Sequence, residues 1–124
     1  MKAIQTDKAP TAIGPYSQAI ESNGFVFCSG QIGIDPENGS LVDGVENQTR
    51  QVINNLAAVL AAVEVELSGI VKTTIYLKNM ADFAKVNEIY GEYFPAHKPA
   101  RVTVGVSELP KGALVEIEAV AVKK

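Results

Sequence analysis

Several stretches of the chain alternate between apolar and polar residues, as strands with two unlike faces do. Residues 71–77, 101–106 and 115–121 show this period of two, and residues 25–28 form an apolar run of β-favouring residues that stops at Ser29-Gly30. Residues 4–22 are expected to add a leading strand or hairpin. A chain of 124 residues builds one core, so residues 1–124 are predicted to form a single domain.

Two helices are predicted between these strands. The first follows Asp43 and Glu46, which resemble a capping box, and the second follows the possible caps Asn79 and Asp82 and ends before Pro95. Apolar residues recur at helical spacing in both segments. They are Val45, Val52, Ile53, Leu56, Val59, Leu60 and Val63 in the first, and Phe83, Val86, Tyr90, Tyr93 and Phe94 in the second.

The resulting order, β-β-β-α-β-α-β-β, favours an α+β fold with two helices packed on one face of a mixed six-stranded sheet. If the valines of residues 102–106 and the apolar residues of 115–119 lie under the helices, Arg101, Thr103, Glu116 and Glu118 lie on the other face. That face either is solvated or lines a pocket shared between subunits. The apolar fraction of 47% is high for a small monomer and suggests subunit contacts.

Composition argues against several functions. The formal net charge is −3 and the basic residues are dispersed, so nucleic acid is an unfavoured partner. One histidine and one cysteine are too few for a structural zinc site, and no apolar run reaches the roughly 20 residues that span a bilayer. The first eight residues contain no apolar signal region, and a single cysteine favours a reducing compartment, so a cytoplasmic location is expected.

A few side chains remain as candidates for chemistry. Arg101 enters its strand from the restricted Pro99-Ala100 segment and suits a carboxylate held by two parallel hydrogen bonds, although an ion pair with Glu116 or Glu118 is an equal alternative. Asn87 lies on the apolar side of the second helix, where a structural hydrogen bond is favoured over ligand binding. We interpret Cys28 as a small buried hydrophobe and His97 as a loop residue.

Five spaced motifs together resemble the reactive intermediate deaminase A family, also called the endoribonuclease L-PSP family. They are Ile13-Gly14-Pro15-Tyr16-Ser17-Gln18-Ala19, Ser29-Gly30-Gln31-Ile32, Asn87-Glu88-Ile89-Tyr90, Pro99-Ala100-Arg101-Val102-Thr103-Val104 and the segment from Leu109 to Ala119. Five motifs in order are more specific than any one of them. The resemblance covers nearly the whole chain, from about Ile4 to Val122.

The resemblance implies a chorismate-mutase-like homotrimer whose sheets meet in a central barrel, with pockets between subunits. It also implies hydrolysis of 2-imino and 2-enamino acids, such as 2-iminobutanoate and 2-iminopropanoate, to 2-oxo acids and ammonia. Such small molecules are released by pyridoxal-phosphate enzymes. The implied reaction needs neither a metal nor an organic cofactor.

The resemblance assigns roles to seven residues. Arg101 matches the arginine that holds the substrate carboxylate, and Glu116 matches the glutamate that positions the attacking water. The pocket positions are Tyr16, Ser29, Gly30, Asn87 and Thr103. Some members carry cysteine at the position of Thr103, so a side-chain role is in doubt there, while a backbone hydrogen bond is retained.

Two other functions stay open at this point. The family's second name suggests an endoribonuclease or translation inhibitor, which the negative charge and the lone His97 do not favour. A non-catalytic trimer that binds small ligands or acts as a holdase is also compatible with carboxylate recognition by Arg101.

Overall fold

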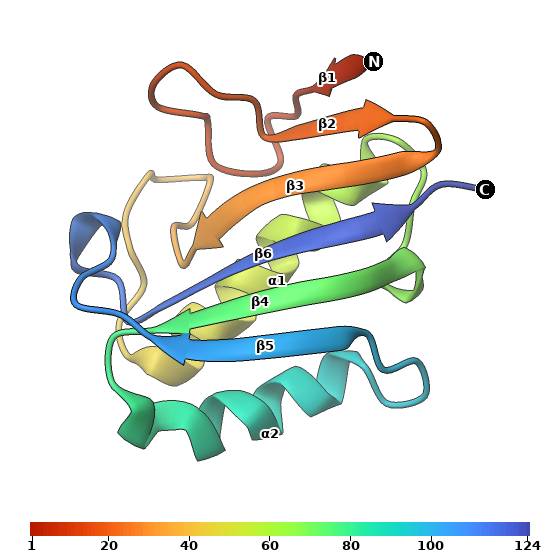
Figure 1. Ribbon diagram of the computed structural model, residues 1–124. Coiled ribbons are helices and arrows are strands. Elements are labelled where there is room, and N and C mark those ends of the chain that lie inside the picture. The colour runs from red at the N-terminus through yellow and green to blue at the C-terminus, as the bar shows by residue number, and fades with distance from the viewer.

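The computed structural model describes residues 1–124 and contains six strands and two α-helices (Figure 1). The strands are β1 (Lys2–Ile4), β2 (Ala19–Ser22), β3 (Phe25–Ile32), β4 (Ile70–Leu77), β5 (Ala100–Gly105) and β6 (Val115–Val122). The helices are α1 (Val45–Ala61) and α2 (Phe83–Tyr93), and single 3-10 turns span Leu67–Gly69, Met80–Asp82 and Pro110–Gly112. The predicted order of elements is confirmed.

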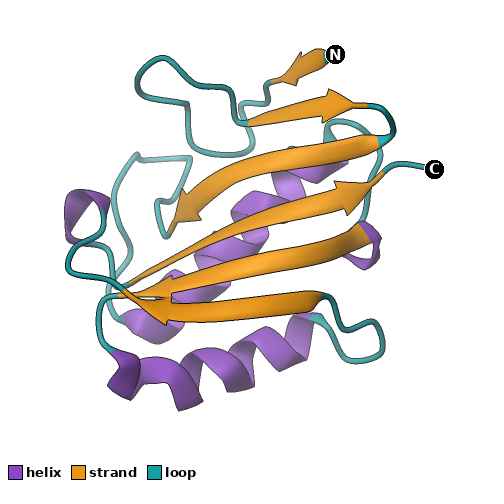
Figure 2. Cartoon of the chain, in the orientation of Figure 1, coloured by secondary structure: helices purple, strands orange, loops and turns teal.

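The strands form one mixed sheet in the order β1-β2-β3-β6-β4-β5. Every neighbouring pair is antiparallel except β4 and β5, which are parallel and joined through α2. Both helices lie on the same side of this sheet (Figure 2), so the predicted α+β architecture is confirmed. We call the helix-free side the open face.

The core lies between α1 and the central strands. Ile53, Leu56 and Leu60 of α1 are at most 2% exposed, as are Ile75 of β4 and Ile117 of β6. Burying one such side chain contributes about 1.5–3 kcal/mol, so the apolar stripe read from the sequence fixes α1 on the sheet.

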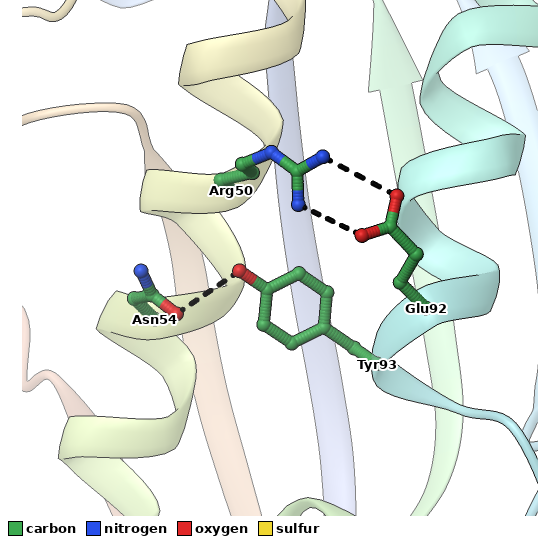
Figure 3. A network of polar contacts seen from close by, with 4 residues as sticks. All are labelled: Arg50, Asn54, Glu92 and Tyr93. Atoms are coloured by element: carbon green, nitrogen blue, oxygen red, sulfur yellow. Dashed lines mark hydrogen bonds and ion pairs between the residues drawn. The ribbon is translucent and has the colours of Figure 1, made fainter.

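The two helices are also tied to each other at the surface (Figure 3). Arg50 of α1 donates hydrogen bonds to both carboxylate oxygens of Glu92 of α2, at 3.1 and 3.3 Å. Tyr93 donates a further bond from its hydroxyl to Asn54 at 3.3 Å. An exposed ion pair of this kind contributes little to stability, so apolar packing remains the main tie.

The expected capping box at Asp43 and Glu46 is wrong. Gly44 is the residue that precedes α1, with φ 83°, and no side chain caps the helix. A φ in this range favours glycine, which has no Cβ, so the chain enters the helix one residue after the predicted cap. Asp82 does precede α2, but neither it nor Asn79 makes a side-chain capping bond, because a 3-10 turn leads into this helix.

β3 is longer than predicted. The strand continues through Ser29 and Gly30 to Ile32, and its pairing with β6 shifts between Cys28 and Gln31. The Ser29-Gly30 step is therefore an irregularity within a strand, where the strand was expected to end. Such irregularities re-aim side chains locally.

The predicted face of β5 is also wrong. Arg101 and Thr103 pair with the buried Thr73 and Ile75 of β4, and paired residues point to the same side of a sheet, which here is the helix side. Val102 and Val104 are 45% and 38% exposed on the open face. The pairing register with β4 decides which face of β5 each residue occupies. The apolar character of Val102 and Val104 is therefore no sign that they lie under the helices.

No helix is both long enough and apolar enough to cross a bilayer.

Candidate functional site

A cavity of about 480 Å³ opens beside the start of β6 and is lined in part by Glu116. Its walls come from the segment before β2, from the irregular part of β3 and from the Pro110-Lys111 turn. Four of the seven predicted site residues line it, namely Tyr16, Ser29, Gly30 and Glu116. The sequence motifs that contain them are far apart in the chain, and the β2-β3-β6 pairing brings them together.

The Glu116 carboxylate lies directly over Gly30. A Cβ atom built on Gly30 would be 2.2 Å from Glu116 Oε2, so only glycine leaves room for this side chain as it stands. The half-buried position raises the pKa of Glu116, and the negative charge of neighbouring Glu118 raises it further. A carboxylate with a raised pKa is a stronger proton acceptor than a fully solvated one.

Glu118 has its own partner on the open face. The hydroxyl of Tyr76 on β4 donates a hydrogen bond of 2.9 Å to Glu118 Oε1. Sequence reasoning missed Tyr76. The alternation in residues 71–77 nevertheless places Tyr76 on the other face of the strand from the buried Ile75.

Ser29 is engaged within the chain. Its hydroxyl donates to the carbonyl oxygen of Ser17 at 2.6 Å, and its backbone N–H donates to the carbonyl oxygen of Gln18 at 3.0 Å. Tyr16 is 52% exposed, and its hydroxyl accepts a bond from the Ile13 N–H at 3.4 Å. These two hydrogen bonds of Ser29 hold the segment that contains Tyr16 against β3.

Arg101 lies in a second cavity, of about 440 Å³, between β5 and α2. Its Nη1 donates a 2.8 Å hydrogen bond to Asn87 Oδ1. The guanidinium carbon is 5.6 Å from the centre of the Phe83 ring and 5.0 Å from that of Tyr90, both within the range of cation–π attraction. Residues 83, 87 and 90 share one face of α2, so a single helix surface orients the guanidinium.

Tyr90 is itself held in place by Thr73 of β4 and by Phe94. Its hydroxyl forms a buried hydrogen bond of 2.7 Å with the Thr73 hydroxyl of β4, and its ring lies 4.6 Å from that of Phe94. Burial raises the pKa of Tyr90 and outweighs the opposing effects of the Thr73 hydrogen bond and the Arg101 charge. The phenol therefore stays neutral beneath the cation.

The remaining candidates are placed as follows. Thr103 is on the helix side of β5, and its hydroxyl oxygen is buried without a hydrogen-bond partner. Cys28 is buried, which raises the pKa of its thiol to about 12 and confirms its interpretation as a small hydrophobe. His97 lies in the loop after α2, as predicted, where its Nε2 contacts the Ile70 carbonyl oxygen.

Six of the seven residues thus form two groups, and Thr103 lines neither cavity. The Glu116 cavity and the Arg101 cavity share no lining residue, and the two side chains point to opposite sides of the sheet. The alternative of an ion pair between Arg101 and Glu116 or Glu118 is wrong, because the salt bridges of the chain are Arg50–Glu92 and Lys123–Glu21. Asn87, expected on the apolar side of α2, is exposed and bonds Arg101. No group of three His, Cys, Asp or Glu side chains is arranged to hold a metal ion.

Comparison with known proteins decides the family. The family model for endoribonuclease L-PSP matches residues 6–123. The chain belongs to the endoribonuclease L-PSP family. Its membership confirms the resemblance drawn from the five motifs.

Relatives from distant organisms match over the whole domain. A RutC family protein of Pyrococcus horikoshii is 54% identical over 124 residues, covering 99% of this chain and 98% of the relative. The human 2-iminobutanoate/2-iminopropanoate deaminase is 46% identical over 123 residues, covering 98% of this chain and 90% of the relative. Among solved structures, Escherichia coli TdcF with bound serine is 38% identical, covers 100% of both chains and has a TM-score of 0.96.

Proposed function

We propose that the protein hydrolyses 2-imino and 2-enamino acids, with 2-iminobutanoate and 2-iminopropanoate as representative substrates, to 2-oxo acids and ammonia. The observation that carries the proposal is the fixed Arg101 guanidinium, which Asn87 and two aromatic rings hold in a cavity that contains no carboxylate partner. An arginine held in this way is suited to bind the carboxylate of a small substrate. The names of the human deaminase and of a serine-bound neighbour support an amino-acid-derived substrate.

The proposal requires more than one copy of the chain. Arg101 and Glu116 occupy separate cavities in one subunit, so a substrate can contact both only where two subunits meet. The open face supplies a surface for that meeting, since Phe25, Phe27 and Val102 are all more than 40% exposed there. We infer a homotrimer in which the open faces form a central barrel, with each site built from the Arg101 cavity of one subunit and the Glu116 cavity of the next.

The chemistry follows from the two half-sites. The carbon of a protonated imine is already electrophilic, so the enzyme chiefly positions the water and the substrate. As the water oxygen bonds to this carbon, Glu116 accepts one of its protons, and the C=N double bond becomes the single bond of a carbinolamine. Return of this proton to the nitrogen makes the amine a leaving group. The C–N bond then breaks as Glu116 takes the proton of the hydroxyl group, so that ammonia and the 2-oxo acid are released. General-base assistance of this kind is worth about 10²–10⁴-fold.

The residues assigned to binding act through this arrangement. Tyr16, Ser29 and Gly30 shape the wall next to Glu116. Thr103 lies two residues after Arg101 on the edge strand β5, and we assign a substrate hydrogen bond to its backbone N–H. Asn87 orients Arg101 through its amide oxygen, so we assign it to arginine positioning within the substrate site. The steps use only these side chains and water.

Purified protein is tested by following imine disappearance and ammonia release while a pyridoxal-phosphate dehydratase generates 2-iminobutanoate from threonine. We expect wild type to accelerate hydrolysis well beyond buffer and Arg101→Ala to lose at least 100-fold in kcat/KM. Arg50→Ala is the matched control, because it removes an exposed arginine paired with Glu92 and should behave as wild type. Wild-type activity no better than buffer, or full activity in Arg101→Ala, contradicts the proposal.

The same samples separate the two other functions. An RNA-cleaving protein would degrade a labelled RNA in a manner that Glu116→Gln or Arg101→Ala abolishes, whereas a binding protein would retain 2-oxobutanoate without turning over the imine. The net charge of −3 and the engagement of His97 with the Ile70 carbonyl do not favour RNA cleavage. We propose that the protein works in the cytoplasm, because its single, free Cys28 fits a reducing compartment.

A further inference from the structure

One wall of the Glu116 cavity is formed by a segment that contains no helix or strand. Residues 5–17 lie between β1 and β2, outside any helix or strand, and contain one backbone hydrogen bond of their own, from the Tyr16 N–H to the Gly14 carbonyl oxygen. Four residues of this segment line the cavity, namely Pro10, Thr11, Ile13 and Tyr16. The shape of the cavity therefore depends on what holds the segment in place.

The side chain of Gln18 makes four hydrogen bonds to the backbone of residues 6–10. Its Oε1 accepts a hydrogen bond from the Thr6 N–H at 2.7 Å, and its Nε2 donates to the carbonyl oxygens of Thr6 and Pro10 at 3.1 and 2.8 Å. The Ala9 carbonyl oxygen also accepts from Nε2, at 3.5 Å. Gln18 is only 3% exposed, so these bonds are shielded from water.

The same residue is attached to the strand on the far side of the cavity. The Gln18 carbonyl oxygen accepts the Ser29 N–H, and the preceding Ser17 carbonyl oxygen accepts the Ser29 hydroxyl. Ser29 directly precedes Gly30, over which Glu116 lies. Gln18 thus connects residues 6–10 to the strand that supports the Glu116 carboxylate.

We propose that Gln18 is a positioning residue, whose amide fixes the segment of residues 5–17 so that it closes the cavity around substrate next to Glu116. This inference deepens the proposed deaminase function and rests on it. An amide is required because the side chain must accept from one N–H and donate to several carbonyl oxygens at once. Methionine has a similar length but can do neither well, and an ionised glutamate can accept but not donate.

Glutamate provides a test that depends on pH. In Gln18→Glu, burial and the facing carbonyl oxygens disfavour the ionised carboxylate, so protonation on acidification is expected to supply one O–H donor. The structure therefore predicts partial recovery of Gln18→Glu, relative to wild type at the same pH, as the pH is lowered from about 8.5 to about 6. Gln18→Met has no titrating group and should show no such recovery.

The experiment compares wild type, Gln18→Met and Gln18→Glu in imine hydrolysis and in amide hydrogen exchange. We expect KM to rise about tenfold, the effect of losing one to two hydrogen bonds, with kcat within about threefold of wild type. Exchange should increase in residues 6–13 and stay unchanged in α1 and β6. Asn47→Met is the matched control, because its amide donates only to the Asp43 carbonyl oxygen at the exposed start of α1 and it lines neither cavity.

Several results would overturn the proposal. They are unchanged KM in both variants, faster exchange in residues 6–13 with unchanged KM, or faster exchange throughout the chain, which would indicate a purely structural residue. If wild type does not hydrolyse imines, the proposed function fails. Hydrogen exchange and the affinity for 2-oxobutanoate then decide whether Gln18 shapes the cavity.

Discussion

The guanidinium of Arg101 lies 5.0 Å from the centre of the Tyr90 ring, while the hydroxyl of Tyr90 is bonded to Thr73 on the neighbouring strand. The ring and the hydroxyl therefore have different roles. The ring contacts the cation, and the hydroxyl fixes the ring to the sheet. Substitutions at Tyr90 can separate orientation of Arg101 from stability of the fold.

Tyr90→Leu should lower kcat/KM about 5- to 30-fold, because it removes a cation–π contact of about 1–2 kcal/mol. Tyr90→Phe keeps the ring and leaves the Thr73 hydroxyl unpaired, so we expect an activity loss below threefold and a stability loss of about 1–2 kcal/mol. Imine hydrolysis and urea unfolding measure the two effects. Equal activity losses in both variants would show that the ring does not orient Arg101.

Gly30→Ala should impair the Glu116 half-site with little effect on the rest of the fold. The new Cβ would meet Glu116 Oε2 at 2.2 Å and Cδ at 2.9 Å, so the carboxylate has to move. Because the end of a side chain can rotate, we expect a stability loss of about 1 kcal/mol and a 10- to 100-fold loss of kcat/KM.

A double-mutant cycle identifies the cause of the Gly30→Ala effect. In a Glu116→Ala background the clash is absent, so Gly30→Ala should cost no stability there. The measurement is the free energy of unfolding of all four proteins. A stability loss that is the same in both backgrounds would place the clash elsewhere than at Glu116.

The acid limb of the activity profile should reflect the raised pKa of Glu116. As a general base it must be ionised, so kcat/KM falls as the pH decreases through this pKa, at a higher pH than for an ordinary glutamate. Glu118→Gln removes the smaller of the two causes and should move the limb to lower pH, while burial keeps it above the ordinary value. Tyr76→Phe is the control, since it leaves the Glu118 charge in place. An acid limb that does not move in Glu118→Gln would mean that it reports another group.

The same raised pKa has a consequence for stability. A carboxyl group whose pKa is higher in the folded state favours folding when protonated, and this contribution is lost as the pH rises through the folded-state pKa. Glu116→Gln cannot ionise, so it should be more stable than wild type at pH 7 and lose most of its activity. Thermal unfolding at pH 7 and at about pH 4 tests this. A stability advantage that did not shrink at the lower pH would contradict it.

Much of this fold could be predicted from the sequence, because each element carries its own period. The helical spacing from Val45 to Val63 and the alternation from Val115 to Ala121 are local patterns that tertiary contacts reinforce. The site residues were found from motifs. Their grouping into two cavities depends on strand order, which a period cannot reveal.

Other features could not be read from the sequence for physical reasons. The valines of β5 indicated that their face lies under the helices. They lie instead on the open face, where an interface between subunits would also cover them. The pairing of Thr73 with Arg101 decides the matter, and pairing is not local. The support of residues 6–10 by Gln18 is likewise hidden, because one glutamine in a turn motif gives no sign of the backbone groups it meets.

Assembly of the subunits should depend on the open face. Phe27 is 47% exposed and Val104 is 38% exposed on this face, and a charge buried in an apolar interface without a partner is strongly unfavourable. Phe27→Asp and Val104→Asp should therefore convert a trimer, with three times the 13.2 kDa subunit mass, into monomers that remain folded. Because each proposed site needs two subunits, these monomers should have lost imine hydrolysis at least 100-fold.

Size-exclusion chromatography with light scattering and circular dichroism measure mass and folding for the same samples. Ala84→Asp is the matched control, because it adds the same charge at an exposed position of α2 and should leave both assembly and activity intact. A wild-type monomer that hydrolyses imines would refute the two-subunit site. So would monomeric Phe27→Asp that retains full activity, since Arg101 and Glu116 of one chain lie in separate cavities on opposite sides of the sheet.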